Sequence, residues 1–362
     1  MWLSHYAKGV LVLQAETVNV DHDFQHEVSE GRINFRALMR WESGLGLVLV
    51  ASFVIGTFAS SQFLTSANFF NIGLSVGDIA IMALPLTLIV ISGEIDLSVA
   101  STLGLSSSLL GYLWIHGWPI QLILPVVLVV GALLGFINGF LVTKLGLPSL
   151  AVTIGTLTLY RGIALILLGS NIVSNFPASY TTIGVTPIPG TPLPWSVGIF
   201  LLLAIVFGVV AHFTPIGRSI FAIGSNAEAA AYSGIKVKQI KMRLYILSGV
   251  VCSLAGILFT FRLATAEYDN ATGLELNAVS IVLLAGVSIF GGRGTILGVV
   301  LAAATVGAIG NALLLANFPQ QAMGLINGGL LLISVFVPNA RDLTARFRGR
   351  AKRGRLVGTK VG

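Results

Sequence analysis

Few residues in this sequence could do chemistry, because only 10% of its 362 residues are charged and most of those lie outside the long apolar stretches. Glu94 and Asp96 stand out, in Gly93-Glu94-Ile95-Asp96 between two apolar stretches. Acids two residues apart do not share a helix face, so a hydrolytic carboxylate pair is not indicated. Asp96 suits the N-cap of the following helix. Alternatively, the two acids contact a cytoplasmic partner or form a charge pair that switches between conformations.

Three further polar residues, Asp78, Asn138 and Arg161, interrupt the apolar stretches themselves. An ionisable side chain is costly in lipid and should face a cavity or a partner. Asp78 and Arg161 therefore either hold helices together or line a pathway, and Asn138 can hydrogen-bond across helices. Residues that contact a neutral substrate are expected to be polar and aromatic rather than charged.

The sequence contains no pattern typical of an enzyme active site or of a metal site. Cys252 is the single cysteine, which excludes an internal disulfide and a Cys/His zinc pattern. The turn Gly291-Gly292-Arg293-Gly294-Thr295 lacks the phosphate-loop pattern, so we expect a tight inner turn with Arg293 at a lipid or partner surface. An intramembrane enzyme would need a catalytic pair, and His212 has no evident partner. We therefore predict no catalytic residue, no metal site and no cofactor bound by this chain.

The elements that must position these residues are predicted to be membrane-spanning helices. Hydrophobic residues make up 55% of the chain and recur in runs of about 20, the length that crosses a ~30 Å hydrocarbon core. We predict an all-α polytopic membrane protein with about ten spans: 45–63, 73–92, 97–114, 119–141, 149–168, 197–213, 244–262, 276–290, 295–315 and 322–337. The span at 276–290 is short enough to be a half-helix or a re-entrant segment.

The basic residues predict the orientation. If both termini are cytoplasmic, all but two of the 21 Lys/Arg residues lie on the inner side, the exceptions being Arg161 and Arg262. The net charge of +7 is concentrated after the last span, which indicates an anchor at anionic lipid rather than a nucleic-acid site. The predicted parts are a cytoplasmic segment 1–43, a transmembrane domain 44–338 with an inner loop 214–243, and a basic cytoplasmic tail 339–362.

The inner loop 214–243 contains a short segment, 225–234, with the features of a capped helix. Ser225 and Glu228 can form a capping box, and Gly234 suits the left-handed residue that closes the helix. The alanines between them favour helix and leave a smooth face that could dock into a groove on another protein. Alternatively, this helix merely links the sixth and seventh spans.

The same loop carries a resemblance to a known family. Glu228-Ala229-Ala230-x-x-x-Gly234 is similar to the EAA-x-x-x-G loop of ABC importer permeases, which seats on the ATPase subunit. Over residues 45–338 the chain resembles the ribose-type (carbohydrate uptake class 2) sugar permeases. The motifs that carry this resemblance are Ser92-Gly93-Glu94-Ile95-Asp96-Leu97-Ser98-Val99, Tyr160-Arg161-Gly162, Gly217-Arg218, Ala222-x-Gly224-x-Asn226, Ser233-Gly234-Ile235 and Gly286-Val287-Ser288-Ile289-Phe290-Gly291-Gly292-Arg293-Gly294-Thr295. Glu94 stands where many sugar permeases have glycine, which, with Arg40-Trp41-Glu42, favours a branch that includes rhamnose-type and autoinducer-2-type permeases.

The resemblance implies a transmembrane subunit in the inner membrane of a bacterium. Its implied partners are a cytoplasmic ABC ATPase that binds ATP, an extracytoplasmic sugar-binding protein, a second permease copy or homologue in a homo- or heterodimer, and membrane lipid. The residues expected to couple to the ATPase are Ser225, Glu228, Ala229, Ala230 and Gly234. Those expected at an inner turn or gate are Glu94, Asp96, Gly292 and Arg293. The implied substrate is a monosaccharide or, alternatively, an autoinducer-2-like furanosyl compound; a third alternative, an ion-coupled secondary transporter, would depend on Asp78.

Overall fold

The computed structural model describes residues 35–319, 324–325, 328–329 and 332, and these residues fold almost entirely into helices. The chain divides into two units, Met1–Trp41 and Glu42–Gly362, and the account below concerns the second unit. The helices are α3 (Phe35–Ala59), α4 (Ser66–Ile91), α5 (Val99–Ile115), α6 (Ile120–Thr143), α7 (Ser149–Leu168), α8 (Ala178–Val185), α9 (Trp195–Phe213), α10 (Pro215–Ser225), α11 (Ala227–Tyr232), α12 (Val237–Leu263), α13 (Leu274–Leu284) and α14 (Ile296–Leu315).

Within the described residues, seven helices are long and apolar enough to cross a membrane. They are α4, α6, α7, α9, α12, α14 and the part of α3 from Trp41 to Ala59. The predicted division of 73–114 is confirmed as two helices, α4 and α5, but α5, with 17 residues, is shorter than the helices counted as spans. The segment predicted as a half-helix is α13, whose 11 residues span only about 16 Å. The predicted span at 322–337 lies largely outside the described residues, so the number ten and the position of both termini stay predictions.

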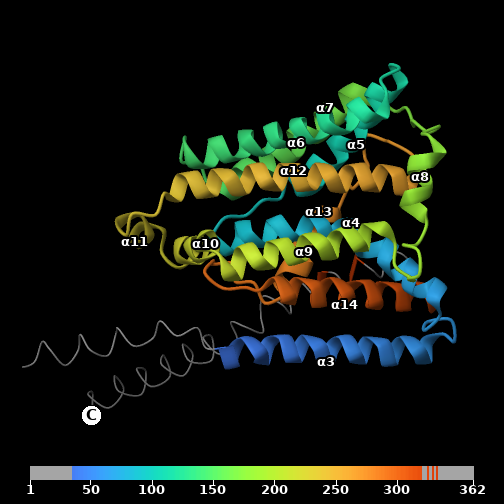
Figure 1. Ribbon diagram of the computed structural model, residues 1–362, viewed down its shortest axis with the longest axis horizontal. Coiled ribbons are helices and arrows are strands. Elements are labelled where there is room, and N and C mark those ends of the chain that lie inside the picture. The colour runs from blue at the N-terminus through green and yellow to red at the C-terminus, as the bar shows by residue number, and fades with distance from the viewer. Residues whose placement is uncertain (1–34, 320–323, 326–327, 330–331, 333–362) are drawn as a thin grey trace, which may run out of the picture. The chain divides into compact units, whose positions relative to one another are not determined.

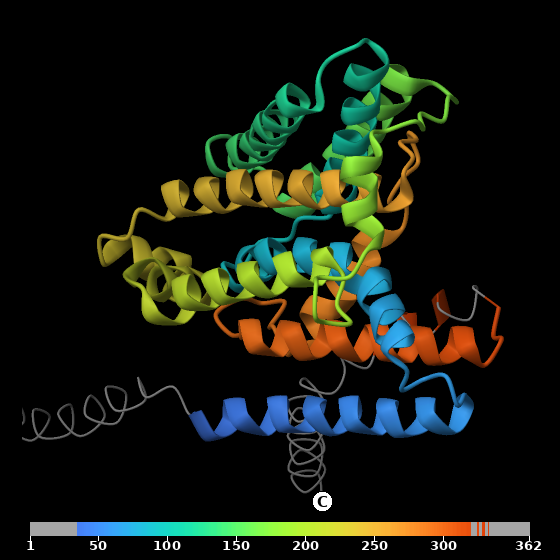
Figure 2. The same cartoon turned by 45° about the vertical axis from the view of Figure 1, so that its right-hand side comes forward.

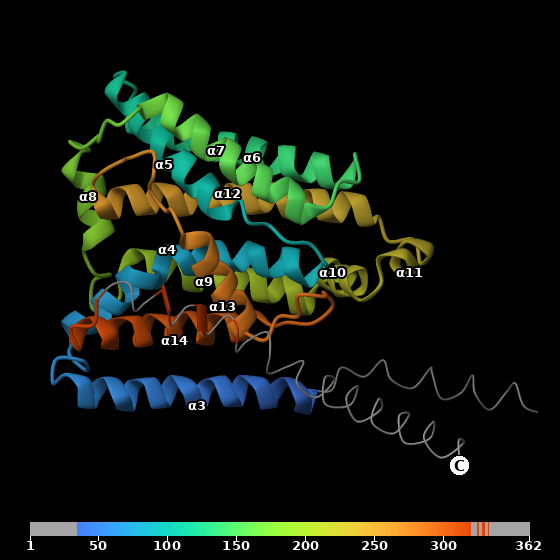
Figure 3. The ribbon, with the colours of Figure 1, turned by 180° about the vertical axis from the view of Figure 1, so that it is seen from behind.

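Helix α4 forms the centre of the second unit (Figures 1 and 3). Within the most apolar 18-residue stretch of α4, 83% of the residues are buried, because α12, α14 and α9 all pack against this helix. By contrast, only about a third of α6, α7 and α9 is buried, which leaves broad apolar surfaces for lipid or for another subunit. The structure therefore places Asp78, which lies on α4, inside the protein and not at its lipid surface.

Helices α6 and α12 pack backbone against backbone along a row of glycines. Gly131 and Gly135 stand one turn apart on α6, and a Cβ at Gly135 would overlap the carbonyl oxygen of Tyr245 on α12. A Cβ at Gly249 would likewise overlap the carbonyl oxygen of Gly131. Small residues four apart allow such an approach in membranes, where helices associate by van der Waals packing. This seam ties α12, and with it the loop that precedes α12, to the body of the protein.

The connecting segments gather at the two ends of the helices. Helices α10 and α11 lie at one end and α8 at the other (Figures 1 and 2). Helix α8 begins after Pro177, in the connection between α7 and α9. Proline is well tolerated at a helix start because the first N–H groups have no intrahelical acceptor. The predicted inner loop 214–243 consists of α10, α11 and the first turns of α12.

Candidate functional site

Two connecting turns and the last helical turn of α10, all far apart in the sequence, meet at the end of the bundle beside α11. They are the turn at Gly93, the segment at Gly224 and the turn at Gly291-Gly292, and we call their meeting point the glycine junction. The N–H of Gly292 donates to the carbonyl oxygen of Ile91 at 2.8 Å. A Cβ at Gly224 would overlap that same oxygen, and one at Gly291 would come within 3.0 Å of the Cα atoms of both Gly224 and Gly93. Only glycine allows three backbones to meet so closely.

Backbone conformation gives a second reason for glycine at two of these turns. Gly93 has φ of 82° and Gly292 has φ of 73°, which lie in the left-handed region that disfavours residues with a Cβ. Arg293, between Gly292 and Gly294, is exposed on this turn. The structure shows a tight turn at Gly291–Thr295, as expected, and its last residue caps α14: the Thr295 hydroxyl accepts from the Gly298 N–H at 3.0 Å.

The acidic turn after α4 is held by neighbours on two sides. Glu94 forms an ion pair with Lys241 in the second turn of α12. The N–H of Ile95 donates to the Ser149 hydroxyl at 3.2 Å, and the Thr153 hydroxyl donates to the carbonyl oxygen of Ile95 at 3.3 Å, both from α7. The turn therefore connects α4, α7 and α12, and any displacement of α12 would act on it directly through Lys241.

Asp96 is buried in a hydrogen-bonded network rather than paired with a cation. One carboxylate oxygen accepts from the N–H and the hydroxyl of Ser98 at 2.9 and 2.6 Å, and the other accepts from the Ser248 hydroxyl at 3.2 Å. Asn138 of α6 donates to the Ser98 hydroxyl at 2.7 Å, which confirms its predicted bond across helices. The predicted N-cap role of Asp96 was wrong, because Ser98 occupies that position and α5 begins two residues later than a cap at Asp96 requires.

The short helix predicted at 225–234 is α11, which is two residues shorter at each end (Ala227–Tyr232) and is separated from α10 by Asn226. Ser225 ends α10, and its hydroxyl donates back to the carbonyl oxygen of Phe221 at 3.0 Å. Asn226 is the N-cap of α11: its side-chain oxygen accepts from the N–H groups of Glu228 and Ala229. The predicted capping box of Ser225 and Glu228 was therefore wrong. Both Ser and Asn are good N-caps, and the extended backbone at Asn226 decides between them.

Side chains of α11 divide between an inward and an outward face. Ala230 is buried, with 5% of its surface exposed. Glu228 and Ala229 are exposed, and Tyr232 keeps 86% of its surface in the open. Gly234 closes the segment with φ of 85°, the left-handed conformation that the sequence indicated. The outward face is the part of α11 that a partner protein could contact, and Ala230 seats the helix on its own chain.

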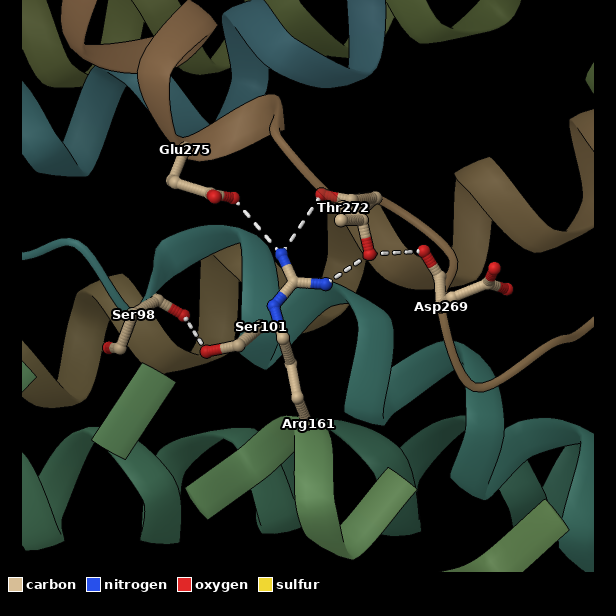
Figure 4. Close-up of polar contacts among 7 residues, drawn as sticks. Ser98, Ser101, Arg161, Asp269, Thr272 and Glu275 are labelled. Carbon is tan, nitrogen blue, oxygen red and sulfur yellow. Dashed lines mark hydrogen bonds and ion pairs between the residues drawn. The ribbon is translucent and has the colours of Figure 1, made fainter. Parts of the chain in front are cut away.

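Arg161 links α7 to the segment before α13 (Figure 4). Its guanidinium pairs with Glu275 at 3.1 Å and also donates to the Thr272 hydroxyl and, at 3.5 Å, to the Ala271 carbonyl oxygen. Two roles were predicted for Arg161, to hold helices together or to line a pathway, and this geometry supports the first. Arg161 reaches past the start of α5 and holds α13, which is too short to span the membrane alone.

This clamp leads to the first prediction. We expect Arg161→Gln and Glu275→Gln each to lower the thermal unfolding midpoint by a few degrees, because each leaves a partly buried charge without its partner. The double variant should lose no more than the worse single variant, since the interaction is then already absent. Thermal unfolding of the purified protein in one detergent measures this. Arg218→Gln, which removes an exposed cation, is the control, and additive losses in the double variant would contradict the clamp.

Asp78 forms an ion pair of its own with Arg262, the residue near the end of α12, at 2.7 Å. Its other carboxylate oxygen has no hydrogen-bond partner among the described residues. Arg262 also lies over the ring of Phe259, with 4.9 Å from the guanidinium carbon to the ring centroid. Helix α12 is thus tied to the middle of α4 through Arg262 and to the turn after α4 through Lys241.

Comparison with known proteins identifies the family. Residues 68–335 match the family model described as branched-chain amino acid transport system / permease component. The chain belongs to this permease family. The permease is 33% identical over 308 residues to the autoinducer 2 import system permease protein LsrD of Yersinia enterocolitica, covering 82% of this chain and 90% of the relative. It is 34% identical over 310 residues to LsrD of Klebsiella pneumoniae, covering 82% and 91%. No solved structure matches the chain.

The family and the helices together define the permease in outline. It is a multi-pass protein of the bacterial inner membrane and the transmembrane subunit of an ATP-driven importer. The matched residues include all three turns of the glycine junction, the two ion pairs of α12 and the Arg161 clamp. The features described above therefore belong to the permease domain itself.

Several residues of this site were not singled out from the sequence. Lys241 and Glu275 are the partners of Glu94 and Arg161, and Ser248 completes the Asp96 network. Glu42, named before only within Arg40-Trp41-Glu42, accepts from the Thr295 hydroxyl at 2.6 Å. A search for residues of opposite charge to balance each ionisable group in an apolar run could have indicated Glu275, because few acids are available in this chain.

Proposed function

We propose that the permease imports a small hydroxylated furanosyl compound of the autoinducer-2 type. The observation that carries this proposal is the similarity to two permeases named for autoinducer-2 import, each matched over about nine-tenths of its length. A monosaccharide is the second candidate, since the motifs at Gly93, Gly224 and Gly292 resemble those of ribose-type permeases. In both cases the substrate is a small neutral polyol.

The proposed machinery has four kinds of component. A cytoplasmic ATPase binds and hydrolyses ATP, so this chain carries no catalytic residue. A binding protein outside the membrane delivers the substrate, and a second permease copy or homologue completes the pathway. The broad apolar faces of α6, α7 and α9 leave room for that second copy and for lipid. Ten spans with both termini in the cytoplasm accommodate these partners on the expected sides.

Coupling is proposed to run from α11 through α12 to the acidic turn. Glu228 and Ala229 contact the ATPase, Ala230 seats α11, and Ser225 and Gly234 bound the segment that moves. Movement of α11 displaces the start of α12, and the pair of Lys241 with Glu94 carries that displacement to the turn that holds Asp96. The turn at Gly292 and Arg293 follows because it contacts the backbone at Gly224. Alternating access then arises from helices that move as units.

A substrate panel tests the proposal, and this is the second prediction. In the source bacterium, deletion of the gene for this chain should lower uptake of labelled autoinducer-2-type compound at least tenfold, and a plasmid copy should restore it. Uptake of leucine should not change. Loss confined to ribose or rhamnose would favour the monosaccharide instead. Loss of leucine uptake, or no loss for any of these compounds, would contradict the proposal.

An energy-source experiment separates the importer from an ion-coupled transporter. Uptake should persist when an uncoupler collapses the proton gradient while the ATP concentration is held constant. The pairing of Asp78 with Arg262 supports this expectation, because a carboxylate neutralised by a guanidinium is a poor site for a coupling cation. Collapse of uptake under the uncoupler would instead support the ion-coupled alternative.

A further inference from the structure

A cavity lined by cations lies where α6 ends and α12 begins, at the same end of the bundle as α10 and α11 (Figure 1). Its volume is about 200 Å³, and its lining residues are Lys144, Lys238, Gln239, Met242 and Arg243. Three of these five carry positive charge and none is acidic. None of the three cations forms an ion pair with a described acid, whereas nearby Lys241 is neutralised by Glu94.

All three cations are exposed, and the start of α12 makes their concentration unfavourable without a bound anion. Lys238 and Arg243 lie in the first two turns of α12, where the helix dipole already contributes positive charge. Lys144 lines the same cavity as these two residues, so the three positive charges also repel one another. A bound anion would relieve both effects. A phosphate group is the anion whose charge and hydrogen-bond acceptors suit two lysines and an arginine together.

The exposed apolar residues of α6 next to the cavity indicate which kind of molecule carries the phosphate group. Val129, Leu133, Phe136 and Phe140 are all exposed on α6, and they stand three or four residues apart, so they form one stripe along the helix. Lys144 continues this stripe at the same spacing and brings it to the cavity. On α12, exposed Leu247 lies one turn from Arg243 in the same way. A cationic cavity at the end of an apolar stripe matches an anionic headgroup with its acyl chain.

We propose that this cavity binds the phosphate headgroup of an anionic phospholipid, whose acyl chain lies along the α6 stripe. Phosphate could also come from a soluble molecule, but a soluble phosphate makes no use of the stripe. The lipid bridges the end of α6 and the start of α12, next to the segment that leads from α11 into α12. It thereby fixes the seat of α12 on α6 at the point where movement of α11 would arrive.

Native mass spectrometry of the full-length chain, released from nanodiscs that contain phosphatidylcholine and phosphatidylglycerol, tests this third prediction. We expect the wild-type protein to retain one phosphatidylglycerol that the K144Q/R243Q variant does not, with an apparent affinity roughly 30-fold weaker in the variant. The control variant R218Q/K236Q removes two exposed cations from the same end of the molecule and should retain the lipid. Both variants should keep the wild-type circular dichroism spectrum, which shows that they fold.

Each of the following three results would overturn the proposal. Equal loss of phosphatidylglycerol in R218Q/K236Q would show that surface charge in general, and not this cavity, attracts the lipid. Displacement of the retained lipid by millimolar inorganic phosphate, or binding of phosphate to the wild type in pure phosphatidylcholine nanodiscs with the same loss in K144Q/R243Q, would assign the cavity to a soluble phosphate. Retention of lipid by K144Q/R243Q at the wild-type affinity would contradict the site altogether.

Discussion

Replacement of Ala229 by arginine is expected to abolish ATP-driven uptake while the permease still inserts and folds. Ala229 lies on the exposed face of α11, so an arginine there points away from the chain and costs little in folding. It would place a long charged side chain between α11 and the groove of the ATPase. A mismatch at the centre of an interface commonly weakens binding by more than ~2 kcal/mol, which is roughly 30-fold.

Two measurements together check this fourth prediction. The ATPase should no longer co-purify with tagged Ala229→Arg protein in mild detergent, and uptake should fall at least tenfold. The matched control is Ala178→Arg, which makes the same change at an exposed alanine of α8, at the other end of the bundle. It should keep both the ATPase and uptake. Normal uptake by Ala229→Arg would rule out this face of α11 as the coupling surface.

Ala230→Arg gives an informative contrast. Because Ala230 is buried against its own chain, an arginine there must displace α11 from its seat. We expect the loss of uptake to be accompanied by a lower thermal unfolding midpoint, which Ala229→Arg should not show. Comparison of the two variants therefore distinguishes a residue that contacts the ATPase, Ala229, from one that holds α11 on its own chain, Ala230. The two residues are nevertheless neighbours in the EAA segment.

The helical framework could be predicted from the sequence because lipid imposes a simple rule on composition. Runs of about 20 apolar residues identified α7, α9 and α14 within a few residues. The beginning of α12 was placed seven residues too late, at 244 instead of 237, because its first turns are basic. The basic residues mark a change in composition, but a helix can continue across such a change when its backbone hydrogen bonds stay intact.

The meeting of the three glycine turns could not be predicted, because it depends on tertiary packing between segments more than 60 residues apart. Each turn was visible by itself, as a glycine-rich or acidic interruption between apolar runs. Nothing local indicates that Gly292 bonds to Ile91 or that Gly224 fits between them. The ion partners were missed for the same reason: Arg161 and Glu275 are 114 residues apart. By contrast, the Asn226 cap was missed locally, because Ser225 satisfies the same preference one residue earlier.

Replacement of Gly224 by alanine is expected to uncouple the permease from its ATPase. The added Cβ would overlap the carbonyl oxygen of Ile91 and lie too close to the N–H of Gly292, so it would break the hydrogen bond between them. These obstacles are backbone atoms, which cannot rotate away as a side chain can. We expect a cost of about 1–3 kcal/mol from overpacking, together with a separation of the Gly291-Gly292 turn from Gly224.

The readout of this fifth prediction separates coupling from assembly. The ATPase should still co-purify with Gly224→Ala, because the exposed face of α11 is intact, but uptake should fall at least tenfold and ATP hydrolysis should no longer respond to the loaded binding protein. Gly155→Ala on α7 is the matched control, since a Cβ there meets no atom within 4 Å and alanine favours helix. If both variants transport normally, the glycine junction is packing without a part in coupling. If only Gly224→Ala fails while its ATPase remains bound, the contact between these three turns is the step that converts movement of α11 into movement of the helices.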